Sequence, residues 1–99
     1  MGSRLELHKV LVDILGSENV YYDPPTTMEY PAIQYNRSKI DTKKANNQTY
    51  IKTNCYTVTV IDWMPDNESI EKLLKLPMCS YDRGYVSDGL HHDVLQLYY

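Results

Sequence analysis

The sequence predicts an α+β domain in which two helices pack on one face of a small, mostly antiparallel sheet. Two amphipathic stretches have helical spacing of their apolar residues, and five short stretches rich in β-branched and aromatic residues have the character of strands. Their order along the chain is α-β-β-β-α-β-β. A length of 99 residues leaves room for one domain, residues 1–99.

The first helix is expected over residues 4–15. Ser3 and Glu6 fit a capping box before it, and Gly16 suits a left-handed cap after it. Apolar residues recur at helical spacing and form a stripe that should face the core: Leu5, Leu7, Val10, Leu11, Val12, Ile14 and Leu15.

Two short strands should follow at residues 20–22 and 30–35, separated by the break at Asp23-Pro24-Pro25. Residues 36–48 are polar, with Ile40 as their single aliphatic anchor. We predict a long loop there, which is mobile until a partner orders it.

The clearest strand covers residues 49–62. Alternation places Tyr56, Val58 and Val60 on one face. The other face should hold Tyr50, Thr53, Cys55, Thr57 and Thr59. The alternation is irregular before Asn54, which indicates a bulge or bend in that region.

A second helix is expected over residues 68–76, capped by Asp66 or Asn67 and ended by Pro77. Its inward side chains should be Ile70, Leu73, Leu74 and Leu76. Two final strands at residues 79–86 and 93–98 should be joined through a turn at residues 87–89, where Gly89 can adopt positive φ.

Composition limits the class of protein. Hydrophobic residues at 42% and charged residues at 23% are typical of a globular chain, and no apolar run approaches the roughly 20 residues that span a bilayer. The net charge of −3 argues against nucleic-acid binding driven by overall charge. We expect a soluble intracellular protein in which Cys55 and Cys79 are reduced and partly buried.

Candidate catalytic chemistry is sparse. His91 and His92 are adjacent, so in a strand they should point to opposite faces and cannot readily share a metal ion. The carboxylates near turns should bond local backbone: Asp62, Asp66, Asp82, Asp88 and Asp93. The sequence has no nucleophile elbow, phosphate-binding glycine loop or zinc-protease motif, so we expect no enzyme, no metal and no cofactor.

Two features favour interaction surfaces. Residues 37–44 hold four positive charges against Asp41, which suits either phosphate contacts or a solvated loop. Ten Tyr and one Trp with no Phe suggest rings that lie beside polar or subunit interfaces.

Several segments together carry a resemblance to a known family. They are Tyr22-Asp23-Pro24-Pro25, the stretches 30–35 and 56–62, Tyr81-Asp82-Arg83-Gly84-Tyr85, residues 88–92 and Leu97-Tyr98-Tyr99. In this order, with the Lys/Asn-rich segment between them, the chain resembles small tail-completion or tail-terminator proteins of long-tailed bacteriophages and prophages, also described as minor capsid or head–tail joining proteins.

The resemblance implies a structural virion protein rather than an enzyme. Such proteins form rings, commonly hexamers, that cap the tail tube and meet neck or connector proteins, while DNA only passes through the channel and no membrane takes part. The expected location is the tail or neck of the virion, and the host cytoplasm during assembly. The candidate interface residues are Tyr22, Tyr35, Arg37, Lys39, Lys43, Lys44, Tyr98 and Tyr99.

Two other classes remain open from the sequence. A small intracellular α+β domain that binds a ligand or regulates a partner would need an apolar pocket with converging polar groups. A nucleic-acid-binding domain would depend on residues 37–44 alone.

Overall fold

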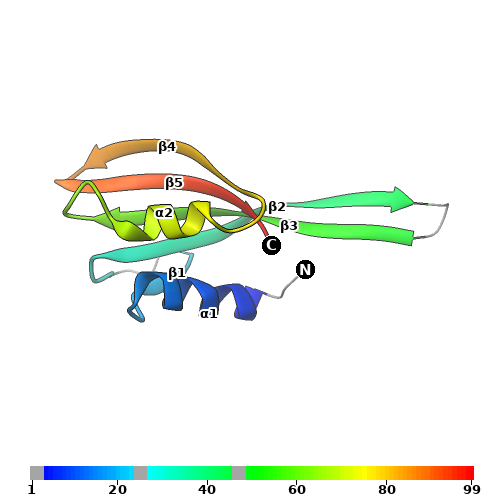
Figure 1. Ribbon diagram of the computed structural model, residues 1–99, viewed down its shortest axis with the longest axis horizontal. Coiled ribbons are helices and arrows are strands. Elements are labelled where there is room, and N and C mark those ends of the chain that lie inside the picture. The colour runs from blue at the N-terminus through cyan, green and yellow to red at the C-terminus, as the bar shows by residue number, and fades with distance from the viewer. Residues whose placement is uncertain (1–3, 24–26, 46–48) are drawn as a thin grey trace.

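The computed structural model describes residues 4–23, 27–45 and 49–99, with the backbone alone for residues 39–45 and 49–53. Figure 1 shows two helices and five strands in the predicted order. The elements are α1 (Arg4–Leu15), β1 (Val20–Tyr22), β2 (Ala32–Ala45), β3 (Thr49–Asp62), α2 (Glu68–Leu74), β4 (Cys79–Ser87) and β5 (Leu90–Tyr98).

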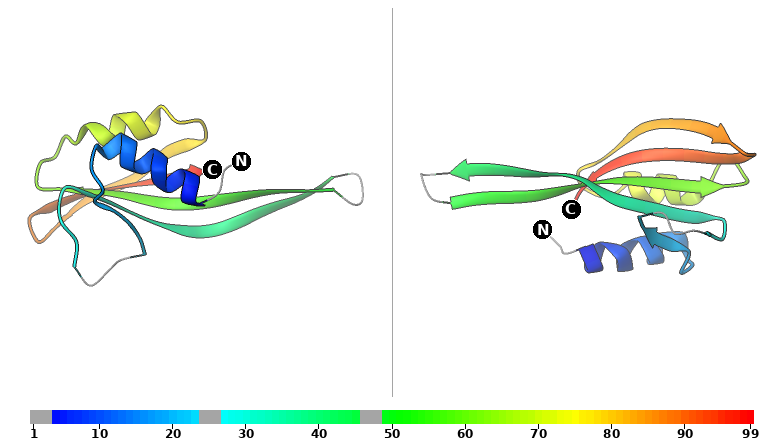
Figure 2. Two further views of the ribbon diagram at one scale, coloured as in Figure 1. Left: turned by 90° about the horizontal axis from the view of Figure 1, so that it is seen from below. Right: turned by 180° about the vertical axis from the view of Figure 1, so that it is seen from behind.

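The five strands form one sheet in the order β1-β2-β3-β5-β4. β1 runs parallel to β2, and every other neighbouring pair is antiparallel. Both helices lie on the same face of this sheet (Figure 2, left). The predicted fold class is confirmed.

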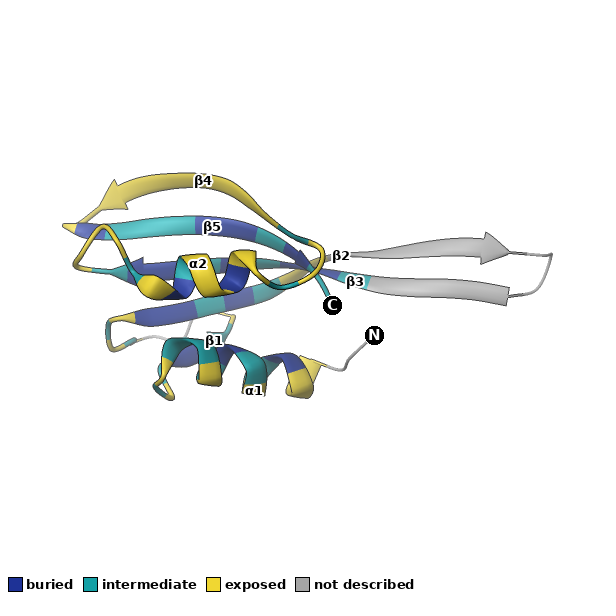
Figure 3. Ribbon diagram, viewed as in Figure 1, coloured by how far each residue is buried: buried dark blue, intermediate teal, exposed yellow. Residues whose placement is uncertain are grey.

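The core lies between the helices and the three central strands. Its fully buried side chains on the sheet are Ile33, Tyr35, Tyr56, Val58, Val60, Leu95 and Leu97, and the helices add Leu7, Leu11 and Leu73. Figure 3 shows this burial along β2, β3 and β5, whereas β4 is exposed over most of its length. The prediction that Tyr56, Val58 and Val60 share one face of the strand at 49–62 is therefore confirmed, and this is the face that the helices cover.

Two residues of the predicted helix stripes are exposed. Leu5 is 64% exposed and Leu74 is 42% exposed. Leu5 lies about 200° around the helix from buried Leu7, and Leu74 lies about 100° from buried Leu73. The buried stripes are thus narrower than the apolar pattern predicted.

Helix ends follow local rules. Gly16 has φ 76° and donates its N–H to the Val12 carbonyl at 2.9 Å, as expected of a left-handed cap. Asn67 is the cap of α2, and its side-chain oxygen accepts from the Ser69 N–H at 2.8 Å. α2 ends at Leu74, two residues earlier than predicted, because the Lys75 N–H already bonds within the final turn. Ser3 lies outside the described residues.

The largest correction concerns the predicted polar loop. β2 continues through Asn36 to Ala45 as a strand, and each of these residues except Ser38 pairs with β3. Residues 46–48 of that loop lie outside the described residues. The polar pattern misled because a strand needs an apolar face only where a layer covers it.

The expected irregularity in the strand at 49–62 lies on its partner strand instead. The register between β2 and β3 shifts between Arg37 and Lys39, so that Ser38 is the extra residue. Its hydroxyl donates to the Cys55 carbonyl at 3.1 Å. The bulge therefore marks the point where the two strands leave the covered part of the sheet.

Beyond the bulge, β2 and β3 pair only with each other among the described elements. β1 reaches only to Tyr35, and β5 pairs with β3 from Cys55 onward. We call residues 39–45 of β2 and 49–53 of β3 the arm. The arm projects beyond the rest of the domain and gives it a length of 51 Å against 23 and 22 Å in the other directions (Figure 1).

The last hairpin is longer than predicted. β5 begins at Leu90, three residues earlier than expected, and the turn consists of Asp88 and Gly89. Both residues have positive φ, 53° and 75°, which is the geometry of the tight turn that matches strand twist. The hairpin presents β4 as the outer strand.

Candidate assembly interface

The sheet order leaves two free strand edges that face in opposite directions. On one side β4 is the outermost strand, and eight of its nine residues are exposed. On the other side β1 covers only Ile33–Tyr35. From Asn36 to Ala45, the side of β2 that faces away from β3 has no neighbouring strand within the described part of the chain.

The β4 edge exposes apolar side chains. Met78, just before the strand, is 68% exposed and Val86 is 60% exposed. Tyr81 and Tyr85 are each 47% exposed. An exposed edge strand with this composition is a template for pairing with another chain, and exposed apolar patches commonly mark interaction sites.

The two tyrosines of β4 are held in place by their neighbours on β5. The Tyr81 hydroxyl donates to Asp93 Oδ1 at 2.8 Å, and this hydrogen bond raises the pKa of Tyr81. Gly84 makes room for that hydroxyl, because a Cβ there would lie 2.5 Å from it. On the opposite face Tyr85 stacks on His92, with the ring centroids 4.7 Å apart. Rings already fixed in this way lose little freedom when a partner binds.

A second exposed aromatic group lies at the end of the sheet near the β4–β5 turn. Trp63 is 57% exposed and packs edge-on against Tyr30, with centroids 5.9 Å apart. Its ring also lies 4.0 Å from where a Cβ of Gly89 would be. Trp63 was not singled out from the sequence; the available signal was the chain's single Trp just after a strand.

Tyr35 is not an exposed interface residue, and that prediction is wrong. It is fully buried and its hydroxyl lies 2.8 Å from His8 Nδ1. Burial raises its pKa, with the nearby Arg4 acting in the opposite direction. The prediction placed Tyr35 beside a loop, but β2 continues past it and the residue faces α1.

Tyr22 is half-buried beside Tyr35. The two rings meet edge-to-face with centroids 5.1 Å apart, and the Arg4 guanidinium lies 4.5 Å from the centroid of Tyr22. This geometry fits a cation–π contact. Tyr22 therefore packs against the core through Tyr35, while part of its ring remains exposed.

Tyr98 and Tyr99 are half-buried at the base of the arm. The Tyr98 N–H donates to the Met78 carbonyl at 3.1 Å, and the Tyr99 N–H donates to the Asn54 carbonyl at 3.0 Å. Tyr99 also packs against the core. These two hydrogen bonds hold the last residues of the described chain beside Met78 and beside Asn54, where the arm begins.

The predicted basic residues lie on β2. Arg37 is exposed just before the bulge, while Lys39, Lys43 and Lys44 follow on the arm opposite Cys55, Ile51 and Tyr50. The side chains of these lysines lie outside the description. The structure thus places the basic residues on one strand, with Tyr35 two residues before Arg37, and Lys39 and Tyr98 both pair with Cys55 from opposite sides.

The charge of the chain is divided between its parts. Residues 36–45 contain four Lys and Arg residues and one acid, a formal charge of +3. Residues 54–99, which include β4, β5 and α2, contain three basic and seven acidic residues, a formal charge of −4. The β2 edge is therefore basic, whereas β4 carries one acid and one base, Asp82 and Arg83, within an acidic part of the chain.

His92 and Asp62 have backbone partners nearby, whereas Asp82 and Asp93, which were predicted to bond local backbone, bond the side chains of Gln96 and Tyr81. His91 aligns with Asp62 and His92 with Ile61, so the two rings belong to opposite faces, as predicted. Asp62 accepts hydrogen bonds from the Met64 N–H at 3.2 Å and the Asn67 amide at 2.7 Å. No group of three potential metal ligands occurs in the described residues, and both cysteines are free.

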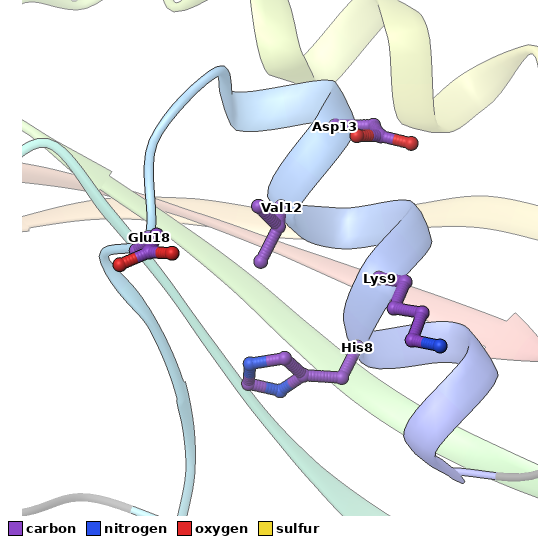
Figure 4. A pocket seen from close by; sticks show the side chains of 5 residues that line it. All are labelled: His8, Lys9, Val12, Asp13 and Glu18. Atoms are coloured by element: carbon purple, nitrogen blue, oxygen red, sulfur yellow. The ribbon is translucent and has the colours of Figure 1, made fainter.

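An open depression of about 570 Å³ lies between α1 and the turn after it. Figure 4 shows that His8 and Val12 extend toward the segment holding Glu18, whereas Lys9 and Asp13 extend from the other side of the helix. The polar groups do not converge on one point. A ligand site needs such convergence, and this depression lacks it.

Comparisons with known proteins give no assignment: no protein-family model matches the chain, and no curated protein matches it significantly. Neither helix in the described ranges has the length and apolar character needed to cross a membrane.

Proposed function

We propose that the chain is the ring-forming subunit of a bacteriophage or prophage tail terminator, which closes the head-proximal end of the tail and joins it to the neck. It acts by assembly and turns over no substrate. The resemblance of several sequence segments to this family supports the proposal, as does an α+β fold with both helices on one face.

One observation carries the proposal: a single subunit has two free strand edges on opposite sides of its sheet. A contact between unlike surfaces of identical subunits repeats around an axis, and it forms a closed ring when the rotation completes a circle. The exposed apolar side chains of β4 offer contact area for such an interface.

The competing function is a ligand-binding or regulatory domain. Its best support is the depression beside α1, but the His8 ring there is already engaged by Tyr35. The free edges and exposed rings of the sheet would have no role in that function. We therefore prefer assembly.

The test uses the phage or prophage that encodes the chain. Deleting the gene should give full heads and tails that do not join, and adding the purified protein to such a lysate should restore joined particles and infectivity. A purified unrelated protein of similar size and charge serves as the control. Joined, infectious particles at the usual yield after the deletion would exclude the proposed function.

A further inference from the structure

We propose that the free edge of β2 in one copy, residues 36–45, adds as a strand to the β4 edge, residues 79–87, of the next copy. This contact rests on the proposed function and names the surfaces that form the ring. It would convert five-stranded sheets into one continuous sheet that passes from subunit to subunit.

The two edges match in length. β4 contributes nine residues, and the uncovered part of β2 contributes ten. β4 ends the strand order on one side, and the part of β2 that β1 leaves uncovered faces the other side, so a subunit can use both edges at once. Each copy would then give one strand edge and receive another.

The two uncovered edges of each subunit point to a second copy as the partner. The β2 edge, residues 36–45, has a formal charge of +3, whereas β4 itself is neutral, with one acid and one base, Asp82 and Arg83. Joining β4 to another β4, as in a two-fold dimer, would leave the basic β2 edges of both copies uncovered. Joining β2 to β4 covers both edges without placing two basic strands side by side, which favours the head-to-tail arrangement.

The side chains of β4 suit a closely packed neighbour. Val86 and Tyr81 belong to the face that carries the helices, while Tyr85 belongs to the other face. An added strand would find apolar contacts above and below its backbone. The bulge between Tyr81 and Arg83 divides the edge, so pairing should be most regular over the part near Val86.

The first test is cysteine cross-linking in a Cys79→Ser background. A Thr42→Cys chain is mixed with either a Ser80→Cys chain or a Ser87→Cys chain, which place the second cysteine near one or the other end of β4. One of the two mixtures should give mixed disulfide dimers, and which one does so reports whether β2 and β4 pair parallel or antiparallel. A Lys72→Cys chain, altered on the exposed side of α2, replaces the Thr42→Cys chain as the control. Efficient linking of Ser80→Cys or Ser87→Cys chains to themselves would instead indicate a two-fold dimer and overturn the proposal.

The second test measures self-association by sedimentation velocity over a range of concentrations. Val86→Lys should weaken association by at least about tenfold, because a lysine on an edge strand opposes pairing and repels the basic strand. Val86→Glu places an acid beside the basic strand and should weaken association less. Leu5→Lys makes the same kind of change at a residue of similar exposure, on α1, and should leave association unchanged.

The outcomes separate this contact from the function itself. If the protein forms rings but Val86→Lys associates like Leu5→Lys and no β2–β4 cross-link forms, the proposed contact is wrong while the ring function stands. A protein that stays monomeric at every concentration and on tails would refute both. Salt-dependent DNA binding that Lys43→Glu/Lys44→Glu abolishes and Lys72→Glu/Lys75→Glu retains, without any self-association, would assign the basic strand to nucleic acid instead.

Discussion

At the scale of single residues, Tyr35 shows how context decides what a tyrosine does. Its ring fills the core between α1 and the sheet, and its hydroxyl meets His8 at 2.8 Å. Tyr85 has the same side chain but lies exposed on the outer strand. Nothing local in the sequence distinguishes them, because the difference depends on which strand is central and which is at the edge.

The Tyr35→Phe variant tests this environment. At neutral pH it should lose about 0.5–1.5 kcal/mol of unfolding free energy, the usual value of one hydrogen bond. Burial raises the pKa of Tyr35, so the stabilisation is fully present below the unfolded value near pH 10 and is lost as pH rises through the folded value. The difference between wild type and variant should therefore shrink in denaturant titrations above about pH 10.

Tyr85→Phe is the matched control, since it removes a hydroxyl from an exposed ring. It should change the unfolding free energy by less than about 0.5 kcal/mol at neutral pH. If the loss of unfolding free energy in Tyr35→Phe stayed constant from pH 8 to pH 11, the conclusion that Tyr35 is buried as a protonated phenol would be contradicted.

Leu11 and Leu5 give a second pair on the same helix. Leu11→Ala removes a fully buried side chain and should cost about 2–5 kcal/mol of unfolding free energy, whereas Leu5→Ala alters a side chain 64% exposed and should cost less than about 0.5 kcal/mol. Chemical denaturation of both variants measures the difference. Equal costs would mean that the buried face of α1 is misassigned.

At the scale of elements, the sequence predicted both helices and the whole of β3, and it failed for the uncovered part of β2. Helices α1 and α2 and the covered half of β3 follow apolar patterns that predict them correctly. The continuation of β2 from Asn36 to Ala45 has no such pattern, because the arm projects beyond the helices. These residues form a strand because they pair with β3. Such pairing depends on two segments together, so the pattern of one segment does not predict it.

A shortened arm tests this division of the molecule. Replacing residues 41–53 by Asn-Gly joins Ile40 to its partner Asn54 through a two-residue turn. The buried core of the described chain lies outside the removed segment, so the variant should keep a cooperative thermal transition and wild-type helix content by circular dichroism. Loss of that transition would show that the folding of the rest of the domain depends on the arm.

The cap of α2 gives a smaller effect. Asn67→Ala should cost about 0.5–2 kcal/mol of unfolding free energy, because the Ser69 N–H loses its acceptor and Asp62 loses the amide that it binds. Asn67→Ser keeps a capping oxygen and should recover part of that loss. If serine were no better than alanine, the cap would not be the cause.

At the scale of the whole molecule, the candidate interface depends on sheet order, which the sequence did not reveal. The hairpin of β4 and β5 could be predicted from its turn, but β5 rather than β4 is the strand that pairs with β3. That choice makes β4 the exposed edge and leaves its apolar side chains at the surface. The sequence predicted residues 37–44 as part of a loop, whereas they lie on β2, and it included Tyr35 among the interface residues although its ring is buried.

Electron microscopy of tails from the encoding phage, with the chain labelled by an epitope tag, tests the central claim most directly. We expect the label as a single ring at the head-proximal end of each tail, present with wild type and Leu5→Lys and absent with Val86→Lys. Label distributed along the tube, or missing from tails that join heads normally, would contradict the assignment of this chain as a ring-forming terminator.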